Sequence, residues 1–231
     1  MSETAAKPAK AMDKVQALRE FYKVLLLSQS GKGKTYSFRN VDPTTFALVN
    51  IENKPLPFKN KFEHHVRPTT VKEALDAILE FGKRDNGITA IGIDSFSAFT
   101  DLLVAEARAN YEGWDVWNYY NKTLSYFFEI IKKIKKEVFI TAHYEVLGIE
   151  GAAEKRTKVK GKEWEGVIEK EFTIVLFGDN KFDGNGKPDY FYHLAKEGTP
   201  AKCPPAIFGS ETYRVPNDVK HILDKIVEFA S

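Results

Sequence analysis

The stretch that determines the fold is residues 23–35, which read KVLLLSQSGKGKT. Its first half is a compact apolar run and predicts a buried strand. Its second half is a small, polar turn in which Gly31 and Gly33 allow backbone torsions that other residues avoid. A loop of this kind, placed between a strand and a helix, points its backbone N–H groups at a phosphate group. The stretch therefore predicts a phosphate-binding loop followed by a helix.

The side chains of this loop have distinct expected roles. Lys34 is expected to neutralise the β- and γ-phosphates of a nucleotide, and Thr35 to offer its hydroxyl to Mg²⁺. The usual pattern begins with glycine, whereas this chain has serine at that position. The predicted nucleotide-binding residues are Ser28, Gln29, Ser30, Gly31, Lys32, Gly33, Lys34, Thr35 and Tyr36.

Composition and charge narrow the class of protein. The 231 residues suffice for one domain, or one domain with a small appendage, and 43% of them are hydrophobic. The 34 basic residues nearly balance the 32 acidic ones, so the protein is not a polycation that coats nucleic acid through its overall charge. Cys203 is the only cysteine, which excludes an intrachain disulfide and fits a reducing cytosol. Apolar runs are far too short for a bilayer, so we expect a cytoplasmic protein without a membrane partner.

Strands and helices are predicted to alternate along most of the chain. The predicted strands are 23–28, 46–51, 90–93, 138–142, 172–177 and 190–194, and the predicted helices are 13–22, 70–83, 99–136 with a break near Gly113, and 218–229. This order predicts an α/β fold whose central sheet is mainly parallel and flanked by helices, with an antiparallel C-terminal extension. Residues 1–21 are expected to be a mobile tail with a short helix, and residues 22–231 the folded domain.

Two acids follow predicted strand ends. Asp94 lies 60 residues after Lys34 and is predicted to hold Mg²⁺ through water, although it is also a candidate cap for the next helix. In AAA+ ATPases a glutamate usually follows this aspartate, but here the next residue is Ser95. The catalytic base must then come from another strand end, and Glu52 is the candidate. The alternative for Glu52 is a solvated loop acid.

His143 follows the strand predicted at 138–142, beside the strand that ends at Asp94. From this place it is expected to sense the γ-phosphate and to pass the signal into the following loop. The alternative is a structural histidine at a strand end.

Together these residues resemble the RecA-type core, and more narrowly the small phage RecA-like ATPases of the Sak single-strand-annealing group. The matching pieces cover most of residues 23–178 and read VLLLSQSGKGKTYSF, LVNIE, IGIDSFS, WDVWNYYNKTL, FITAHYEV and KGKEWEGVIEKEF. The resemblance implies DNA-stimulated ATP hydrolysis with Mg²⁺, and assembly with copies of itself into a ring or filament. It also implies single-stranded DNA binding in phage recombination, annealing or replication, in the host bacterial cytoplasm, with a single-strand-binding protein as a further candidate partner.

A basic segment follows His143. In RecA-like proteins the loop after this position contacts DNA, where lysines follow the phosphates and aromatic rings stack on bases. The same proteins often insert a basic finger into the ATP site of the neighbouring subunit, and Lys160 and Lys162 are the candidates here. The alternative is a solvated charged loop. The predicted DNA-binding residues are Tyr144, Lys155, Arg156, Lys158, Lys160, Lys162 and Trp164.

Two other functions stay open. Residues 180–183 read NKFD, which matches the guanine-binding pattern Asn-Lys-x-Asp and would suit a GTP-dependent switch or partner-binding module. The strand ending at Asp94 lacks the Asp-x-x-Gly of GTPases, and the match lies among turn-forming residues, so we interpret it as a hairpin turn. The other alternative, which the irregular Ser28 allows, is a structural nucleotide-binding protein with little turnover.

Overall fold

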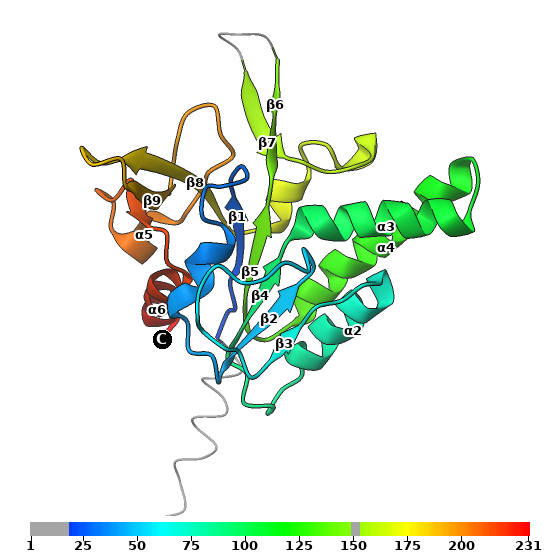
Figure 1. The fold of residues 1–231 in the computed structure, drawn as a ribbon, viewed down its shortest axis with the longest axis horizontal. Coiled ribbons are helices and arrows are strands. Elements are labelled where there is room, and N and C mark those ends of the chain that lie inside the picture. Colours follow the sequence, from blue (N-terminus) through cyan, green and yellow to red (C-terminus); the bar gives the residue numbers. More distant parts are fainter. Residues whose placement is uncertain (1–18, 149–152) are drawn as a thin grey trace, which may run out of the picture.

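The computed structural model describes residues 19–148 and 153–231. Within these residues, eight strands form one sheet in the order β10-β9-β8-β1-β5-β4-β2-β3 (Figure 1). The strands are β1 (Lys23–Leu27), β2 (Phe46–Asn50), β3 (His65–Val66), β4 (Ala90–Asp94), β5 (Glu137–Ala142), β6 (Tyr144–Leu147), β7 (Glu154–Thr157), β8 (Ile174–Phe182), β9 (Pro188–His193) and β10 (Arg214–Pro216). The helices are α2 (Val71–Gly82), α3 (Phe96–Asn110), α4 (Trp114–Lys133), α5 (Pro205–Phe208) and α6 (Val219–Ala230), with 3₁₀ helices η1 (Thr35–Asn40), η2 (Lys162–Trp164) and η3 (Ile168–Glu171).

The predicted fold class is confirmed. Strands β8, β1, β5, β4, β2 and β3 are all parallel, whereas β9 and β10 extend the sheet in antiparallel fashion. Strand β5 lies between β1 and β4. Because parallel strands end at the same edge, the residues that follow β1, β2, β4 and β5 meet there.

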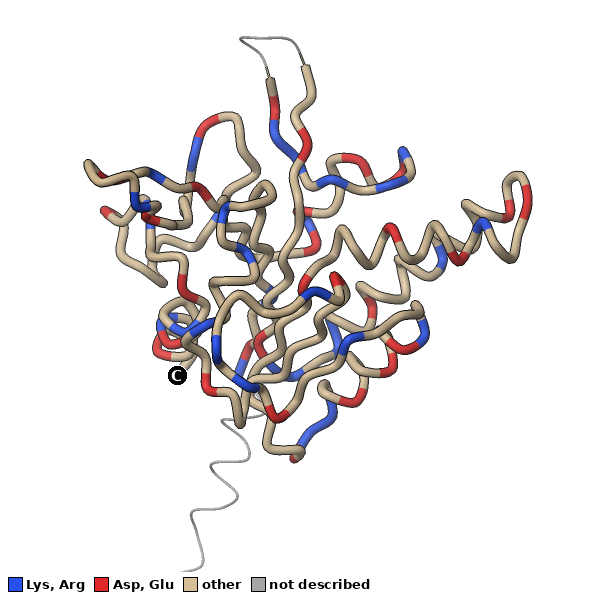
Figure 2. Tube along the Cα trace, in the orientation of Figure 1, with Lys and Arg blue, Asp and Glu red and all other residues tan. Residues whose placement is uncertain are grey.

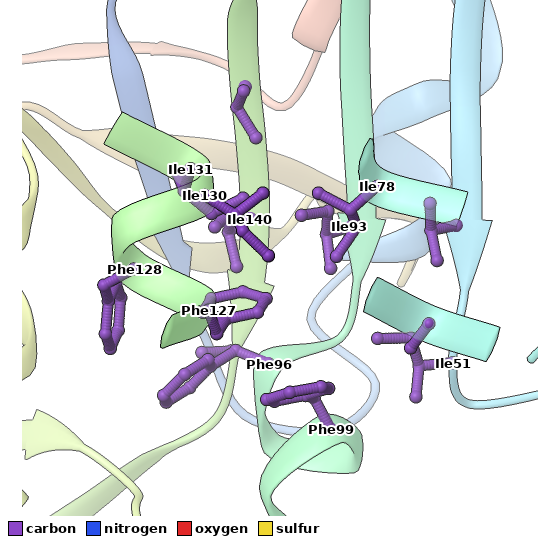
Figure 3. Close-up of a cluster of buried hydrophobic side chains, with 14 of the residues drawn as sticks. Ile51, Ile78, Ile93, Phe96, Phe99, Phe127, Phe128, Ile130, Ile131 and Ile140 are labelled. Atoms are coloured by element: carbon purple, nitrogen blue, oxygen red, sulfur yellow. The ribbon is translucent and has the colours of Figure 1, made fainter. Parts of the chain in front are cut away.

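Both faces of the sheet are covered, because alternate residues of each strand point to opposite sides. Leu25 and Leu27 of β1 belong to the core under α2, α3 and α4, whereas Val24 and Leu26 belong to the core under η1 and α6. Figure 3 shows the first of these cores, in which isoleucines of the strands meet phenylalanines of the helices. No helix in the described part of the chain is long and apolar enough to cross a membrane.

The predicted break near Gly113 is confirmed. This residue has a φ of 56°, a conformation that favours glycine, and it separates α3 from α4. The two helices form a hairpin that projects beyond the sheet in Figure 1. Trp114, at the start of α4, is 81% exposed, whereas Tyr120 is buried. The tip of the hairpin is therefore free of the core that anchors its base.

Several predicted elements were wrong in extent or type. Residues 19–22 are not helical, and the rest of the helix predicted at 13–22 lies outside the described residues. The helix expected after the phosphate-binding loop is η1, a 3₁₀ helix of only six residues. The polar segment after His143 was expected to be a loop, but β6 and β7 pair there as an antiparallel hairpin. Pairing with β9 also carries β8 to Phe182, five residues further than predicted.

Candidate nucleotide-binding site

The phosphate-binding loop lies at the carboxyl end of β1. Gly31 and Gly33 have φ values of 76° and 81°, so the prediction that these glycines supply unusual torsions is confirmed. Lys32 extends away from the centre of the loop, where its ammonium donates to the amide oxygen of Asn180 and lies 3.5 Å from the carboxylate of Asp179. The loop is thereby held against β8 by a side chain that was predicted to bind nucleotide.

Ser28, which stands where the usual pattern has glycine, is accommodated by a neighbouring strand. Its side chain is buried and points at Gly178 of β8. A Cβ atom on Gly178 would lie 2.9 Å from the Cβ of Ser28, which is closer than side chains pack. The absence of a side chain at Gly178 therefore leaves room for the side chain of Ser28. The backbone N–H of Ser28 donates to the carbonyl of Ala142 at 3.1 Å, so this residue keeps its contact with the sheet.

Lys34 lies folded inside the loop. Its ammonium donates to the carbonyls of Ser28 and Gln29, at 3.0 and 2.9 Å, and lies 3.3 Å from Nδ1 of His143. Burial lowers the pKa of Lys34 to about 8, although the carboxylates of Asp94 and Glu52 oppose this effect. A partly desolvated ammonium beside a loop of backbone N–H groups is suited to an anion that replaces the lost water.

Asp94 is the buried acid of the site. One carboxylate oxygen accepts from the Thr35 hydroxyl at 2.6 Å, and the other accepts from the hydroxyl of Thr141 on β5. Burial raises the pKa of Asp94, and the two hydroxyl groups partly offset that effect. The oxygens of Asp94 and Thr35 are hard donors of the kind that Mg²⁺ prefers, and Mg²⁺ usually takes its remaining ligands from water and phosphate. These residues therefore fit the predicted metal site.

Glu52 follows β2 and faces the same edge. One of its oxygens accepts from the Ser95 hydroxyl at 3.3 Å, and the other pairs with the Lys54 ammonium at 2.8 Å. Burial favours the neutral acid, but Lys54 and the more distant Lys34 outweigh burial and lower the pKa of Glu52. A half-buried, ionised carboxylate at this place is able to orient and polarise a water molecule.

The ring of His143 lies between Lys34 and Glu52. Its Nε2 lies 3.9 Å from Glu52, on the side of the ring opposite Lys34. Burial and the Lys34 charge lower the pKa of His143, so the ring is neutral at pH 7. Its Nδ1 then accepts from Lys34 and its Nε2 carries the proton. The carbonyl of His143 accepts from the backbone N–H of Lys158 at 2.8 Å, which connects this edge to the basic segment.

A cleft of about 410 Å³ opens over these groups. Residues of the phosphate-binding loop form one side, and Glu52, Lys54 and His143 form another. Tyr36 and Tyr190 line it as well. A second cavity of about 530 Å³ shares Glu52, Lys54 and His143 and continues along the start of α3.

The basic segment is only partly free to bind a polyanion. Arg156 pairs with two glutamates of the same segment, Glu145 at 3.4 Å and Glu165 at 3.1 Å. Lys160 lies 3.6 Å from Asp101 of α3. Lys158 and Lys162 are exposed and have no salt-bridge partner within residues 19–148 and 153–231. Figure 2 shows both signs of charge along this part of the chain.

The aromatic residues predicted to bind DNA pack against the protein. Trp164 stacks on Phe128 of α4, with ring centroids 5.6 Å apart, and its indole N–H donates to Asn121. Tyr144 packs on Phe177 at 4.8 Å. The Lys155 ammonium lies 5.5 Å from the same Phe177 ring. One face of the Trp164 ring therefore belongs to the core that anchors η2, and the contact of Trp164 with DNA stays a prediction.

Sequence reasoning missed three residues of the site. Thr141 lies within a strand, where threonine is common, so its bond to Asp94 has no local signal. Lys54 follows a strand end by four residues and is one lysine among many. Tyr190 comes from the C-terminal extension and packs against the loop at Gly33. Only the distances in the folded chain identify these residues.

Comparison with known proteins gives the family of the chain. No curated protein matches the chain. Residues 20–203, about four fifths of the chain, match a protein family described as AAA domain, whose members have a P-loop of the ATPase type. The matched range contains the loop, Glu52, Asp94 and His143. The chain therefore belongs to the AAA domain family and has the α/β fold of P-loop nucleoside triphosphatases.

Proposed function

We propose that this protein hydrolyses ATP with Mg²⁺ and acts on single-stranded DNA, in the manner of the RecA-like annealing proteins of phages. The observation that carries the proposal is the convergence of Lys34, Glu52 and His143 on one cleft, with Asp94 buried behind the cleft residue Thr35. These residues follow four different strands, and a purely structural explanation would have to account separately for a reactive side chain at each strand end. The Mg²⁺ ion, when bound, would neutralise charge on the phosphates.

Each residue has a defined part in the proposed reaction. Lys34 leaves the loop carbonyls and pairs with the phosphates, whose charge is stronger than that of a carbonyl dipole. Asp94 and Thr35 hold the metal and its water ligands. Glu52 leaves Lys54 and orients the attacking water. His143, released from Lys34, reports the presence of the γ-phosphate to β6 and β7 through its direct chain connection.

The DNA contact is proposed for the face on which the hairpin of β6 and β7 stands. The hairpin begins directly after His143 and rises from the edge of the sheet that holds the site (Figure 1). Lys158 and Lys162 are exposed and form no salt bridge with another described residue, so we propose that they contact phosphates or, in a ring or filament, the nucleotide of the neighbouring subunit. The ion pairs of Arg156 and Lys160 make these two residues weaker candidates.

The test is steady-state ATP hydrolysis measured with and without single-stranded DNA over a range of protein concentrations. We expect stimulation by DNA, and a specific activity that rises with concentration because neighbouring subunits complete the site. Glu52→Gln should reduce turnover about 100-fold and leave ATP binding intact. The double variant Lys158→Ala/Lys162→Ala should lose DNA stimulation, and Lys72→Ala/Lys83→Ala, on α2 and its C-cap, is the charge-matched control. Unchanged turnover in Glu52→Gln would remove Glu52 from the mechanism.

The GTP-dependent alternative has less support from the geometry. Asn180 and Lys181 lie within β8, and only Asp183 starts the turn. The Asp183 carboxylate, which would have to recognise guanine, instead accepts from the backbone N–H groups of Asn185 and Lys187 at 2.9 and 2.8 Å. Competition between ATP and GTP in the same assay tests this alternative, which requires GTP to be the better substrate.

A further inference from the structure

We infer that Tyr190 and Tyr36 form the surface on which the base of a purine nucleotide stacks, an inference that rests on the proposed function. Both rings line the cleft that contains Lys34 and Thr35. Their centroids are 6.3 Å apart and their planes are tilted by 55°. A flat base between two parallel rings needs a centroid separation of about 7 Å, since carbon atoms pack at about 3.5 Å. The two rings therefore form a corner, in which a base stacks on one ring and places its edge against the other.

The corner lies next to the phosphate-binding loop, as one nucleotide requires. A Cβ atom on Gly33 would stand 3.1 Å from a ring carbon of Tyr190, so this ring packs directly on the loop. Tyr36 follows Thr35 in the chain and is 39% exposed. Both rings are therefore at least partly open to the cleft beside the loop.

A chain of contacts holds the two rings at this spacing. The Arg39 guanidinium lies 4.4 Å from the centre of the Tyr36 ring and donates to the carbonyl of Asn217 at 2.6 Å. The backbone N–H of Asn217 donates in turn to the carbonyl of Tyr190 at 3.1 Å. The corner therefore joins η1 to the C-terminal extension, and neither ring depends on a flexible loop for its position.

A buried amide lies beneath the same place. Asn217 is 2% exposed, and neither polar atom of its side chain has a hydrogen-bond partner in the described chain. Its Oδ1 lies 3.4 Å from the position of a Cβ on Gly33. The buried Tyr192 hydroxyl lies close to this amide, so the polar groups beneath the corner are two neighbouring side chains of the C-terminal extension.

The ligand chemistry follows from the rings. Every base has a π face, so stacking on tyrosine strengthens binding of a nucleotide but not of its phosphate groups alone. The corner thus accounts for affinity toward the base, and a purine offers more stacking area than a pyrimidine. Removal of one stacking ring is expected to weaken nucleotide binding on the order of tenfold.

The experiment compares Mg²⁺-ADP with Mg²⁺-pyrophosphate by isothermal titration calorimetry on the full chain. The two probes differ by the adenosine, and neither is a substrate for the proposed hydrolysis. We expect Tyr190→Ala to weaken ADP binding on the order of tenfold and to leave pyrophosphate binding unchanged, while Tyr190→Phe keeps most of the affinity. Tyr36→Ala, at a more exposed position, should give a smaller loss of the same kind. Tyr213→Ala is the matched control, since Tyr213 is 67% exposed and lies outside the cleft.

Three results would overturn the inference. ADP affinity that is unchanged in both Tyr190→Ala and Tyr36→Ala would show that the base binds elsewhere. An equal loss for ADP and pyrophosphate in Tyr190→Ala would assign Tyr190 to the shape of the loop instead. Failure of the unmodified protein to bind either probe would overturn the proposed function, and the base surface with it. If Tyr190→Ala fails to fold, Tyr36→Ala decides the question.

Discussion

Two buried lysines lie at opposite ends of β1, and their similarity is instructive. Lys34 donates to the carbonyls of Ser28 and Gln29, and Lys23 donates to the carbonyls of Ile134 and Lys136, at 2.9 and 2.6 Å. Burial lowers the pKa of each ammonium to about 8. Burial, hydrogen bonding and pKa therefore fail to separate a proposed catalytic lysine from a structural one.

The surroundings separate them. Lys34 lines an open cleft together with Glu52 and His143, and the charge of Asp94 also acts on it. At the other end of β1, Glu137 balances the charge of Lys23 and itself pairs with Arg19 at 2.8 Å. Lys136 and Glu137 line a cavity of about 850 Å³, but Lys23 itself does not. A perturbed lysine thus indicates a functional site only when the lysine itself lines a ligand-sized cavity together with further reactive groups.

The largest expected effect is the loss of nucleotide chemistry in Lys34→Ala. Removal of the ammonium leaves the phosphate charge without its main partner, so ATP hydrolysis should fall by about 100-fold or more. Steady-state phosphate release measures this loss. Lys23→Met is the control and should hydrolyse ATP at the unmodified rate, since Lys23 is remote from the cleft. Equal losses of activity in the two variants would contradict the conclusion that only Lys34 takes part in hydrolysis.

The acids beside the two lysines should differ in the same way. Asp94→Asn removes a carboxylate whose ionisation burial opposes, so the free energy of unfolding should not fall, while Mg²⁺-dependent hydrolysis falls about 100-fold. Glu137→Gln should leave hydrolysis unchanged and lower the unfolding free energy by about 1 kcal/mol, because Arg19 and Lys23 lose their counter-ion. Urea unfolding measures the stability of both variants, and a Mg²⁺ titration of ATP hydrolysis measures their activity. A stability loss in Asp94→Asn would contradict the account of that carboxylate.

A third expected effect, confined to stability, depends on pH. Lys23→Met leaves two carbonyls without a donor and should cost about 2 kcal/mol at pH 7. The pKa of Lys23 is about 8 in the folded chain and 10.5 in the unfolded chain, so the unfolded chain binds more protons between these values. Lys23 therefore adds about 2 kcal/mol to stability as the pH rises through that window, and the variant should lack this part of the increase. Lys34 adds a similar increase to both proteins, so the difference between the two curves reports Lys23. Parallel curves for the two proteins in urea unfolding at pH 7, 8, 9 and 10 would show that Lys23 keeps an ordinary pKa.

Much of the site follows from local sequence pattern. The loop of residues 28–35 is contiguous, and each of Glu52, Asp94 and His143 follows a run that predicts a strand. Because parallel strands end at one edge, the order of elements by itself predicts that these residues meet. The antiparallel extension follows in the same way from turn-forming residues between two apolar runs.

Other parts depend on contacts between distant residues. Thr141 bonds Asp94 only because β5 lies between β1 and β4, and Ser28 fits only because Gly178 lies beside it on β8. The packing of Trp164 on Phe128 could not be predicted from the sequence either. An aromatic residue after a basic run is equally compatible with a core contact and with a nucleic-acid surface.

The sequence by itself determined the phosphate-binding loop, the α/β class and the acids at the strand ends, because each of these depends on neighbours in the chain. The tertiary structure decided which of two similar buried lysines has an open cleft, and which aromatic rings face it. The physical reason is that burial and charge are summed over residues that the fold brings together from far apart, such as Lys34, Asp94 and Tyr190.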